Sequence, residues 1–576
     1  MESNPIVQTY RKLNLLLNQE QKRKGIRALV YSALLGLADL IALGATVPIL
    51  VLTIDKSFLQ KSSKLRWVYE ITGLETEGQF LILLIGIIFI FFVLKNIFGM
   101  WFRKFIKDQC AEIATDYAGK LYSKYLSKDY LSSAKVGTSE MIDKLIYYPF
   151  QLSHGIIFPF ITFLTEFIAI VLIVSLVFLF NPFVFAVLLL VMLPSLYFVF
   201  KYTRKRLYKL GVESDGYRAE TIQGINIGLQ GLEDIKFNDV ESHFLFRYKN
   251  TVGRFLDSNL KSLLYQYIPS RFNEIIAVLG IVVFSIYGYF FSENVGGTRL
   301  LAALFALSIF RLVPALNKVL ASLMSLKTYQ RVLEEEINLE EDAKANLNYL
   351  RFEDSIQLKD VGFRFEDNNS DLFQGINLTI PKGRSVGIYG ESGNGKSTLL
   401  KIITGIIRTN SGVVCVDENV VNENNYKNWQ SQIAYVSQNP FILNGSLWEN
   451  LALGEKREDV DKGKMINCLK EASLNIFFDE WEQNLDIPLG ETGSFISEGQ
   501  KQRICIARAL YKDVKTLVLD EATSALDEEN ERQIQESIKK LLNKDYTILI
   551  IAHKQSFLSI CDDIYKLDKG KLTKTK

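Results

Sequence analysis

The sequence predicts a helical membrane domain with six spanning segments, fused to an α/β domain that holds nucleotide phosphates in a P-loop. Three observations support this fold class. Apolar runs of spanning length fill the first part of the chain, a glycine-rich phosphate-binding pattern follows, and a later strand ends in two carboxylates. The expected domains are 1–335 for the membrane part, 336–353 for a linker and 354–576 for the nucleotide-binding part.

Six apolar runs are long enough to cross a bilayer, which takes about 20 residues of helix. The stretch from Leu81 to Leu94 has no polar face at all. A helix that is apolar all round belongs in lipid rather than on the surface of a soluble helical domain. The expected spans are 26–54, 79–102, 152–181, 182–205, 269–292 and 297–325.

The flanks of these runs predict their orientation. Spans carry more Lys and Arg on their cytoplasmic side, and six basic residues precede the first run, so the N-terminus is expected inside. The uncharged loop at Asn181-Pro182 suits the outside, whereas the long charged segments 103–150 and 206–268 suit the inside. The first run is too long for a signal peptide and is expected to remain as a membrane helix. The six residues are Arg11, Lys12, Lys22, Arg23, Lys24 and Arg27.

Charge and cysteine content argue against other classes. The 66 basic and 64 acidic residues nearly balance, which gives no indication of nucleic-acid binding. The five cysteines fall on the predicted cytoplasmic side without metal-ligand spacing, so neither disulfides nor zinc are expected.

The segment from Gly390 to Ser397 is Gly-Glu-Ser-Gly-Asn-Gly-Lys-Ser, a P-loop between an apolar strand (385–389) and the start of a helix. Such a loop curls around phosphate with its backbone N–H groups aimed at the anion. Lys396 is expected to reach the β- and γ-phosphates of ATP, and Ser397 to bind Mg²⁺. The expected ATP contacts of this segment are Gly390, Glu391, Ser392, Gly393, Asn394, Gly395, Lys396, Ser397 and Thr398.

A second buried strand, from Leu517, ends at Asp520 and Glu521. Taken alone, these acids fit a solvated strand end equally well. Behind a P-loop, Asp520 suits the Mg²⁺ shell and Glu521 suits the base that polarises the attacking water.

With these motifs in place, residues from about 354 to 576 resemble the nucleotide-binding domain of an ATP-binding cassette (ABC) transporter. The resemblance implies that Phe365 stacks on adenine, although a core role on a strand is the alternative. It implies that Gln438 contacts Mg²⁺ and water, that Asp527, in the segment Ser524–Asp527, lies at a dimer interface, and that His553 contacts the γ-phosphate.

The signature segment departs from the family pattern Leu-Ser-Gly-Gly-Gln, because Ile496 replaces Leu and Glu498 replaces the first Gly. Ser497, Gly499 and Gln500 are retained, and in the family this segment reaches ATP bound by the partner subunit. The resemblance therefore implies a dimer, and the complete set of catalytic residues, Lys396, Asp520, Glu521 and His553, favours a homodimer. The change at Glu498 puts the rate of hydrolysis in doubt.

Six spans followed by one cassette resemble the half-transporter of the type IV ABC exporter fold, in which the spanning helices continue into the cytoplasm. The turns of the two long inner segments, near Asp129 to Glu140 and near Ser214 to Gln223, are expected to form short coupling helices that rest on the cassettes.

Charged residues inside the predicted spans are the candidates for a substrate cavity, because such charges are costly in lipid. They share one depth, in the inner half of the bilayer. Interhelical salt bridges are an equally good explanation; if the basic residues face the cavity, they favour an anionic headgroup such as a pyrophosphate. The candidates are Asp39, Lys95, Glu166, Arg271, Glu274 and Arg311.

Three stretches, 310–317, 230–237 and 561–564, resemble bacterial flippases for lipid-linked oligosaccharides, in which the loop 55–78 would form a short outer helix. This resemblance implies ATP-driven movement of a polyprenyl-pyrophosphate glycan to the outer leaflet of the cytoplasmic membrane. It also implies Mg²⁺ as a cofactor and membrane lipid as a partner. An exporter of drugs, lipids or peptides with the same fold is the alternative. Intact Glu521 and His553 disfavour an ATP-gated channel or regulator. The six spans disfavour a soluble P-loop kinase. The fusion of the membrane part and the cassette in one chain disfavours an importer.

Overall fold

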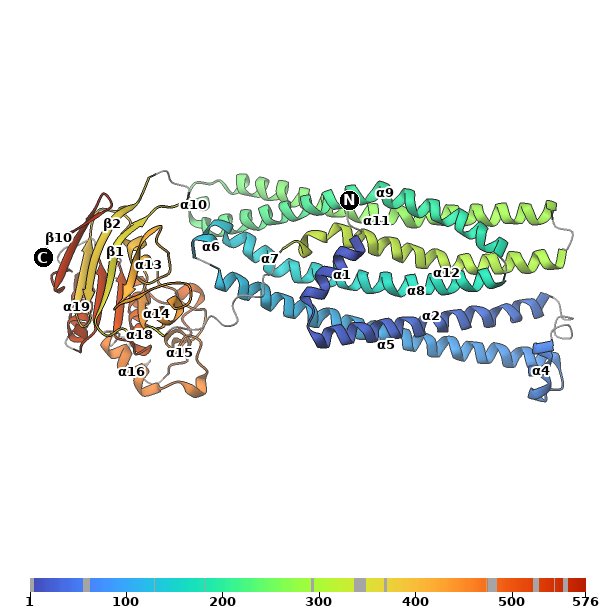
Figure 1. Ribbon diagram of the computed structural model, residues 1–576, viewed down its shortest axis with the longest axis horizontal. Coiled ribbons are helices and arrows are strands. Elements are labelled where there is room, and N and C mark those ends of the chain that lie inside the picture. Colours follow the sequence, from blue (N-terminus) through green and yellow to red (C-terminus); the bar gives the residue numbers. More distant parts are fainter. Residues whose placement is uncertain are drawn as a thin grey trace. The chain divides into compact units, whose positions relative to one another are not determined.

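The computed structural model separates into two compact units, Met1–Lys128 with Ser133–Leu339, and Asp129–Ser132 with Glu340–Lys576. Figure 1 shows a unit of long helices and a unit built around β-sheets. The residues that the structure describes are 5–54, 63–128, 130–180, 182–291, 295–335, 349–366, 370–472, 474, 484–521, 528–542, 544–552 and 558–576.

The first unit is built of helices and has no strand among its described residues. Its elements are α1 (Pro5–Leu16), α2 (Gln19–Ile54), α4 (Ser63–Thr72), α5 (Glu77–Ser127), α6 (Tyr130–Val136), α7 (Thr138–Gln151), a π-helical turn η1 (Leu152–Ile157), α8 (Phe158–Phe180), α9 (Pro182–Gln230), α10 (Leu232–Phe237), α11 (Glu241–Phe291), α12 (Val295–Thr328) and a 3₁₀ turn η2 (Gln330–Leu333). Residues 130–132 of α6 group with the second unit.

Five of the six predicted spans each lie in one of these helices, and the span 152–181 covers η1 and α8. Residues 181 and 292 lie outside the described residues. Among the residues described, four helices are long and apolar enough to span a membrane: Gln19–Thr46, Glu77–Ser127, Thr138–Leu179 and Ile309–Thr328. Exposed apolar side chains such as Ile82, Phe89 and Met100 cover α5. This surface is the one that a lipid-facing helix requires.

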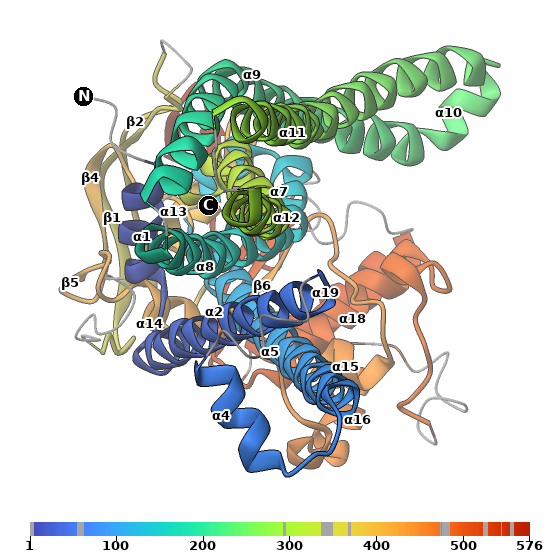
Figure 2. The ribbon, with the colours of Figure 1, turned by 90° about the vertical axis from the view of Figure 1, so that its right-hand side faces the viewer.

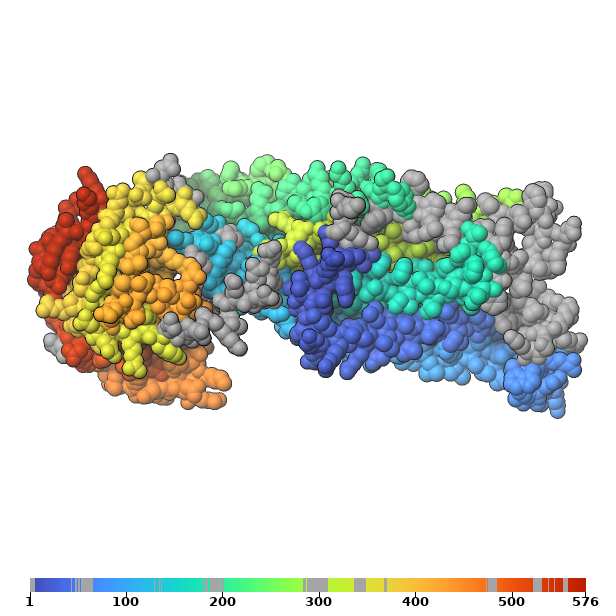
Figure 3. Space-filling view, in the orientation of Figure 1, coloured from blue at the N-terminus to red at the C-terminus, as the bar shows by residue number. Residues whose placement is uncertain are grey.

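The helices extend well past a bilayer. α5 and α11 each have 51 residues, or about 75 Å at helical rise, against a hydrocarbon core of about 30 Å. In this unit α2 packs beside α5 and α8, and α12 packs along α8. Figure 3 shows α2 and α8 side by side, and Figure 2 shows α9 and α11 as a pair joined through α10.

The second predicted turn is wrong, because Ser214–Gln223 lies within α9, before the helix ends. Arg218, in the middle of this stretch, donates to Asp143 of α7 at 2.6 and 3.1 Å, which holds the helix in place. The chain turns instead at α10, which Gly231 precedes and which is followed by Asp239 with a φ of +54°. A left-handed backbone of this kind ends a helix.

The other two expected short helices are present. α6 occupies part of the expected Asp129–Glu140 segment, where Asp129 itself lies outside the described residues, and Gly137, with a φ of +79°, separates it from α7. Within the second unit the hydroxyl of Tyr130 accepts a hydrogen bond of 3.2 Å from Lys401. α4 is the short helix between the first two spans, and its side chains Trp67 and Ile71 are exposed.

The second unit contains two sheets with flanking helices. Its strands are β1 (Ser355–Phe363), β2 (Phe373–Pro381), β3 (Ser385–Tyr389), β4 (Ser411–Val416), β5 (Asn419–Val420), β6 (Ile433–Val436), β7 (Thr516–Asp520), β8 (Thr547–Ile551), β9 (Asp563–Asp568) and β10 (Lys571–Lys574). Its helices are α13 (Lys396–Ile403), α14 (Tyr426–Ser431), α15 (Leu447–Leu451), α16 (Lys462–Glu471), α18 (Glu498–Tyr511) and α19 (Glu528–Leu542), with 3₁₀ turns η3 (Arg457–Asp459) and η5 (Glu491–Gly493).

The larger sheet has the order β10-β9-β3-β8-β7-β6, and β3, β8, β7 and β6 run parallel. Their carboxyl ends therefore meet at one edge, which is where ligands bind in open α/β sheets. The P-loop follows β3 and the two carboxylates end β7, as the sequence predicted. The smaller sheet, β2-β1-β4-β5, is antiparallel.

Candidate functional site

Glycines allow the P-loop to close tightly against the sheet. Gly393 and Gly395 both have a φ of +87°, which side chains with a Cβ rarely adopt. A Cβ on Gly390 would lie 2.3 Å from the carbonyl oxygen of Leu567. The Asn394 side chain fixes the loop by donating to that same carbonyl at 3.2 Å. The loop then leads into α13, which begins at Lys396.

Lys396 lies inside the loop and is only 4% exposed. Its Nζ donates to the carbonyl oxygens of Gly390 (3.1 Å) and Glu391 (3.0 Å), and it lies 3.7 Å from Oε1 of Glu521. The ammonium is therefore directed into the centre of the loop and towards the second carboxylate of β7, where a nucleotide phosphate would need it.

Asp520 sits at the end of β7 between two hydroxyl groups. Ser397 donates to its Oδ1 at 2.8 Å, and Tyr435 of β6 donates to its Oδ2 at 2.8 Å. Burial, reinforced by the nearby carboxylate of Asp520, raises the pKa of Tyr435. The phenol therefore stays a donor and fixes the carboxylate. The sequence analysis did not identify Tyr435. The signal that could have found it is an aromatic residue three residues before Gln438, on the strand that lies beside β7.

Glu521 follows with an unusual backbone. Its φ is +51°, its N–H donates to the carbonyl oxygen of Ile551 at 3.1 Å, and the residue is 7% exposed. Nε2 of Gln438 donates to Oε2 of Glu521 at 2.7 Å. A strained, buried carboxylate beside the loop is a favourable arrangement for a group that must act on a phosphate-bound water.

The oxygen donors of Ser397, Asp520 and Gln438 fit Mg²⁺, which prefers hard oxygen ligands and retains several waters. The Ser397–Asp520 pair, at 2.8 Å, already brings two such donors together beside Lys396. These residues would hold the ion next to the phosphates.

The signature segment begins α18. Ser497 caps the helix: its Oγ accepts from the Gln500 N–H at 3.3 Å, and its own N–H donates to Gln500 Oε1 at 2.6 Å. Glu498 pairs with Lys501 at 2.7 Å. The additional negative charge therefore has a counterion on its own helix.

Other expected ATP contacts have simpler positions. Thr398 lies in the first turn of α13, Ser392 lies in the loop, and Gly499 lies in the first turn of α18. Phe365 is half-buried just after β1 and packs edge-to-face on Phe363, with ring centroids 4.9 Å apart. Asp527 and His553 lie outside the described residues.

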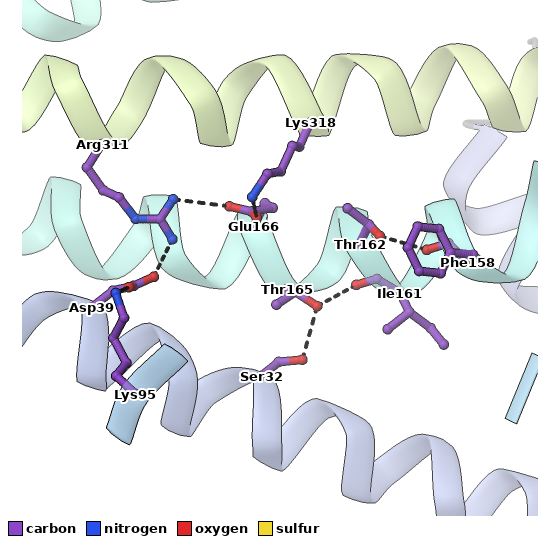
Figure 4. Close-up of polar contacts among 10 residues, drawn as sticks. All are labelled: Ser32, Asp39, Lys95, Phe158, Ile161, Thr162, Thr165, Glu166, Arg311 and Lys318. Atoms are coloured by element: carbon purple, nitrogen blue, oxygen red, sulfur yellow. Dashed lines mark hydrogen bonds and ion pairs between the residues drawn. The ribbon is translucent and has the colours of Figure 1, made fainter. Parts of the chain in front are cut away.

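The membrane unit contains a cavity of about 1150 Å³ between α2, α5, α8 and α12. Four of the predicted charges line it. Lys95 pairs with Asp39 at 2.7 Å, and Arg311 lies between Asp39, to which it donates, and Glu166, at 3.7 Å (Figure 4). The predicted interhelical salt bridges are present.

The other two predicted charges do not join them. Arg271 and Glu274 pair with each other at 3.1 Å on α11, with side chains 77% and 52% exposed. In their place the cavity includes Lys318, which pairs with Glu166 at 2.5 Å, and Arg103. Sequence reasoning missed Lys318. It lies two helical turns after Arg311, on the same face of α12, and that spacing is the signal that would have found it.

Comparison with known proteins agrees with both units. Residues 373–524 match the ABC transporter family, and residues 30–312 match the ABC transporter transmembrane region. A solved structure described as a bacterial Atm1-family ABC exporter with ATP bound superposes with a TM-score of 0.79, covering 96% of this chain and 95% of that chain at 18% identity. This likeness concerns the fold.

Curated relatives align over part of this chain. An ATP-dependent lipid A-core flippase of Vibrio cholerae serotype O1 is 35% identical over 38% of each chain, and one of Cupriavidus pinatubonensis is 27% identical over 59% of each chain. An ABC-type transporter MDR1 of Aureobasidium melanogenum is 38% identical over 39% of this chain and 16% of its own length. The chain thus matches less than two thirds of the length of these relatives.

The P-loop, the carboxylates of β7 and the signature helix occupy one domain, the spanning helices occupy the other, and both match the same family along most of the chain. The chain belongs to the ABC transporter family and has the type IV exporter fold, with a transmembrane domain and a nucleotide-binding domain in one polypeptide.

Proposed function

We propose that two copies of this chain form an ATP-hydrolysing exporter of the cytoplasmic membrane, with the nucleotide-binding domains in the cytoplasm. Its substrate is an amphipathic lipid with an anionic headgroup, and in the finer form of the proposal it is a polyprenyl-pyrophosphate-linked oligosaccharide moved from the inner to the outer leaflet. Domains of 1–335 and 354–576, joined by a linker, fit this arrangement.

The proposal about the substrate rests on the charged cavity. Among the described residues that line it, four are basic and two are acidic, while most of the rest are apolar. A lipid with a phosphate headgroup presents the complementary surface, because its chain suits the apolar lining and its anion suits the excess of positive charge. Relatives named for lipid A-core support a substrate of this lipid type.

The nucleotide site supports ATP hydrolysis. Glu521 orients and polarises the attacking water, Lys396 stabilises charge on the transferred phosphoryl group, and His553 is proposed to contact the γ-phosphate. When bound, Mg²⁺ supplies charge neutralisation on the phosphates. Phe365 is proposed to stack on adenine.

A second copy is proposed because the signature helix of one cassette completes the site of the other. Ser497, Gly499 and Gln500 contribute there, with Asp527 at the interface. α10 is proposed as a coupling helix, since Phe237 is 89% exposed and leaves an apolar surface at the end of the α9–α11 pair.

The test is ATP hydrolysis in liposomes, with polyprenyl-pyrophosphate oligosaccharide, drugs or short peptides added in separate reactions. The glycolipid alone is expected to stimulate wild-type turnover, and the Glu521→Gln variant is the blank. Stimulation by drugs or peptides only would replace the flippase proposal with a general exporter, a candidate that the large apolar part of the cavity lining favours.

A further inference from the structure

The cavity holds a chain of five charges that crosses four helices. Asp39 of α2 and Glu166 of α8 are the acids, and Lys95 of α5, with Arg311 and Lys318 of α12, supplies the bases. Figure 4 shows Arg311 between the two carboxylates, with Lys95 and Lys318 at either end. Both carboxylates have side chains only 10% exposed.

Each acid of this chain keeps one ion pair without Arg311. Asp39 keeps Lys95 at 2.7 Å, and Glu166 keeps Lys318 at 2.5 Å. A carboxylate buried without a partner is strongly destabilising. Because each acid has its own lysine, Arg311 can leave both acids without creating such a group, and it is therefore the exchangeable one of the three bases.

Arg311 also makes the ionic connection between α2 and α12. α12 packs along α8, whereas its contact with α2 is slight over the described residues. Lys318 still ties α12 to α8 through Glu166 if Arg311 moves. The loss of Arg311 from the chain of charges would thus remove the ionic link between α2 and α12, so that α2 is held mainly by its packing on α5 and α8, while the α8–α12 pair stays intact.

We propose that an anionic phosphate headgroup binds in this cavity by taking the guanidinium of Arg311 from Asp39 and Glu166, and that the exchange releases α2 from α12. The headgroup identity rests on the function proposed above. Guanidinium binds phosphate oxygens through two parallel hydrogen bonds, which one lysine ammonium cannot do. Arg103, two turns along α5 from Lys95, provides further positive charge at the same cavity.

Binding is tested with the full chain in phosphatidylcholine nanodiscs and three probes: polyprenyl diphosphate, uncharged polyprenol and inorganic diphosphate. Arg311→Met is expected to weaken the binding of polyprenyl diphosphate at least about tenfold. Arg311→Lys, which keeps the charge, is expected to weaken it by a smaller factor and serves if the methionine variant does not fold. Unchanged binding in a folded Arg311 variant would overturn the proposal.

A charge-neutral double variant separates exchange from simple attraction. Asp39→Asn with Lys95→Met removes one acid and one base, so the net charge is constant while Arg311 loses a competitor. Polyprenyl diphosphate is expected to bind several-fold more tightly. The matched control is Asp257→Asn with Lys261→Met, which removes an exposed pair of 2.6 Å on α11 and is expected to change binding less than about twofold. Weaker binding in the cavity variant would contradict the exchange.

Release is measured as the distance between spin labels on Ile41→Cys of α2 and Phe310→Cys of α12, both exposed positions. The five native cysteines are buried and are therefore poor targets for the label. Proteins that carry a single label show which distances arise between two copies of the chain. Polyprenyl diphosphate is expected to lengthen the α2–α12 distance, and polyprenol is not. An unchanged distance at saturation would reject the release.

The arms also distinguish this inference from the proposed function. If inorganic diphosphate binds through Arg311 and lengthens the distance while the lipid-linked oligosaccharide fails to stimulate hydrolysis, the exchange stands and the proposed substrate falls. If the oligosaccharide stimulates wild type and Arg311→Met equally, the function stands and the exchange falls.

Discussion

Gln438 donates a 2.7 Å hydrogen bond to Glu521, and this bond joins the loop after β6 to the proposed base at the end of β7. The amide therefore fixes the carboxylate from the side opposite to Lys396, which lies 3.7 Å from its other oxygen. Gln438 and Lys396, from different parts of the domain, thus both act on the position of Glu521.

The first prediction concerns this bond. Gln438→Ala should lower the rate of ATP hydrolysis by about tenfold or more, because the base loses its orientation, while Glu521→Gln should lower it by at least about 100-fold. ATP binding, followed by equilibrium titration, should remain within a few-fold of wild type in both. A Gln438→Ala variant with wild-type turnover would show that Glu521 is held by other groups.

The second prediction concerns the hydroxyl group on Asp520. Tyr435→Phe removes the 2.8 Å donor to Oδ2 and leaves Ser397 on the other oxygen. Because groups that orient a metal-binding carboxylate typically change metal affinity by about 10- to 100-fold, the half-saturating Mg²⁺ concentration should rise. It is measured by ATP hydrolysis across a Mg²⁺ series. Tyr389→Phe, at the end of β3, is the matched control, and an equal rise there would remove the role given to Tyr435.

The third prediction concerns the departure from the family signature. Since Lys501 neutralises Glu498 at 2.7 Å, Glu498→Gln should change the apparent ATP affinity by less than about threefold. Lys501→Met leaves the carboxylate unpaired near the proposed nucleotide of the second copy and should weaken the affinity further. Raising the salt concentration should reduce that difference, because the Glu498 carboxylate is exposed. If both variants behave alike, Glu498 does not act through its charge.

The fourth prediction concerns Asp417, whose carboxylate accepts N–H bonds from Glu353 (2.9 Å), Asp354 (2.8 Å) and Ser355 (2.9 Å). Burial opposes ionisation, but these backbone donors win and lower the pKa of Asp417. The stabilisation is therefore complete above the unfolded pKa of about 3.9 and is lost as the pH falls through the lower folded value.

Asp417→Ala should accordingly reduce the Tm of the nucleotide-binding domain at pH 7, and the difference from wild type should shrink on acidification below about pH 4. Scanning calorimetry of the full chain at several pH values measures both. Asp568→Ala on β9 is the control with a more exposed carboxylate. A difference that stays constant with pH would mean that the loss comes from packing rather than from charge.

The nucleotide-binding domain was largely predictable because its signals are local. The P-loop pattern fixes a strand before it and a helix after it, and β3, α13 and β7 lie within a residue of the predicted positions. Tyr435 escaped notice because its role depends on β6 lying beside β7, and strand order is a long-range property that spacing along the chain does not carry.

The membrane domain was predictable in its spans, its first inner turn and part of its charge pairs, but not in its second inner turn or in the full set of cavity charges. A helix as long as α9 gives no signal where it leaves the bilayer, so the turn was placed too early, although Gly231 and Asp239 mark its true position. Arg271 and Glu274 were predicted only from their depth in the bilayer. A residue lines the cavity, however, only if it also lies on the face of its helix that is turned towards the cavity. Lys318 satisfies that second condition.

The π-helical turn η1 sets that face for α8. Each π turn carries one residue more than an α turn, and an extra residue rotates everything beyond it by about 100° around the helix axis. Gly155 lies in η1, where a Cβ would meet the ring of Tyr329 at 2.3 Å, and its carbonyl accepts from Ser325 at 2.9 Å. Upstream, Asp143 faces Arg218, and downstream Glu166 faces Arg311. The turn thus sets the rotation of α8 about its axis. Deleting one residue within it would keep the length of the span nearly constant and turn Glu166 away from the cavity.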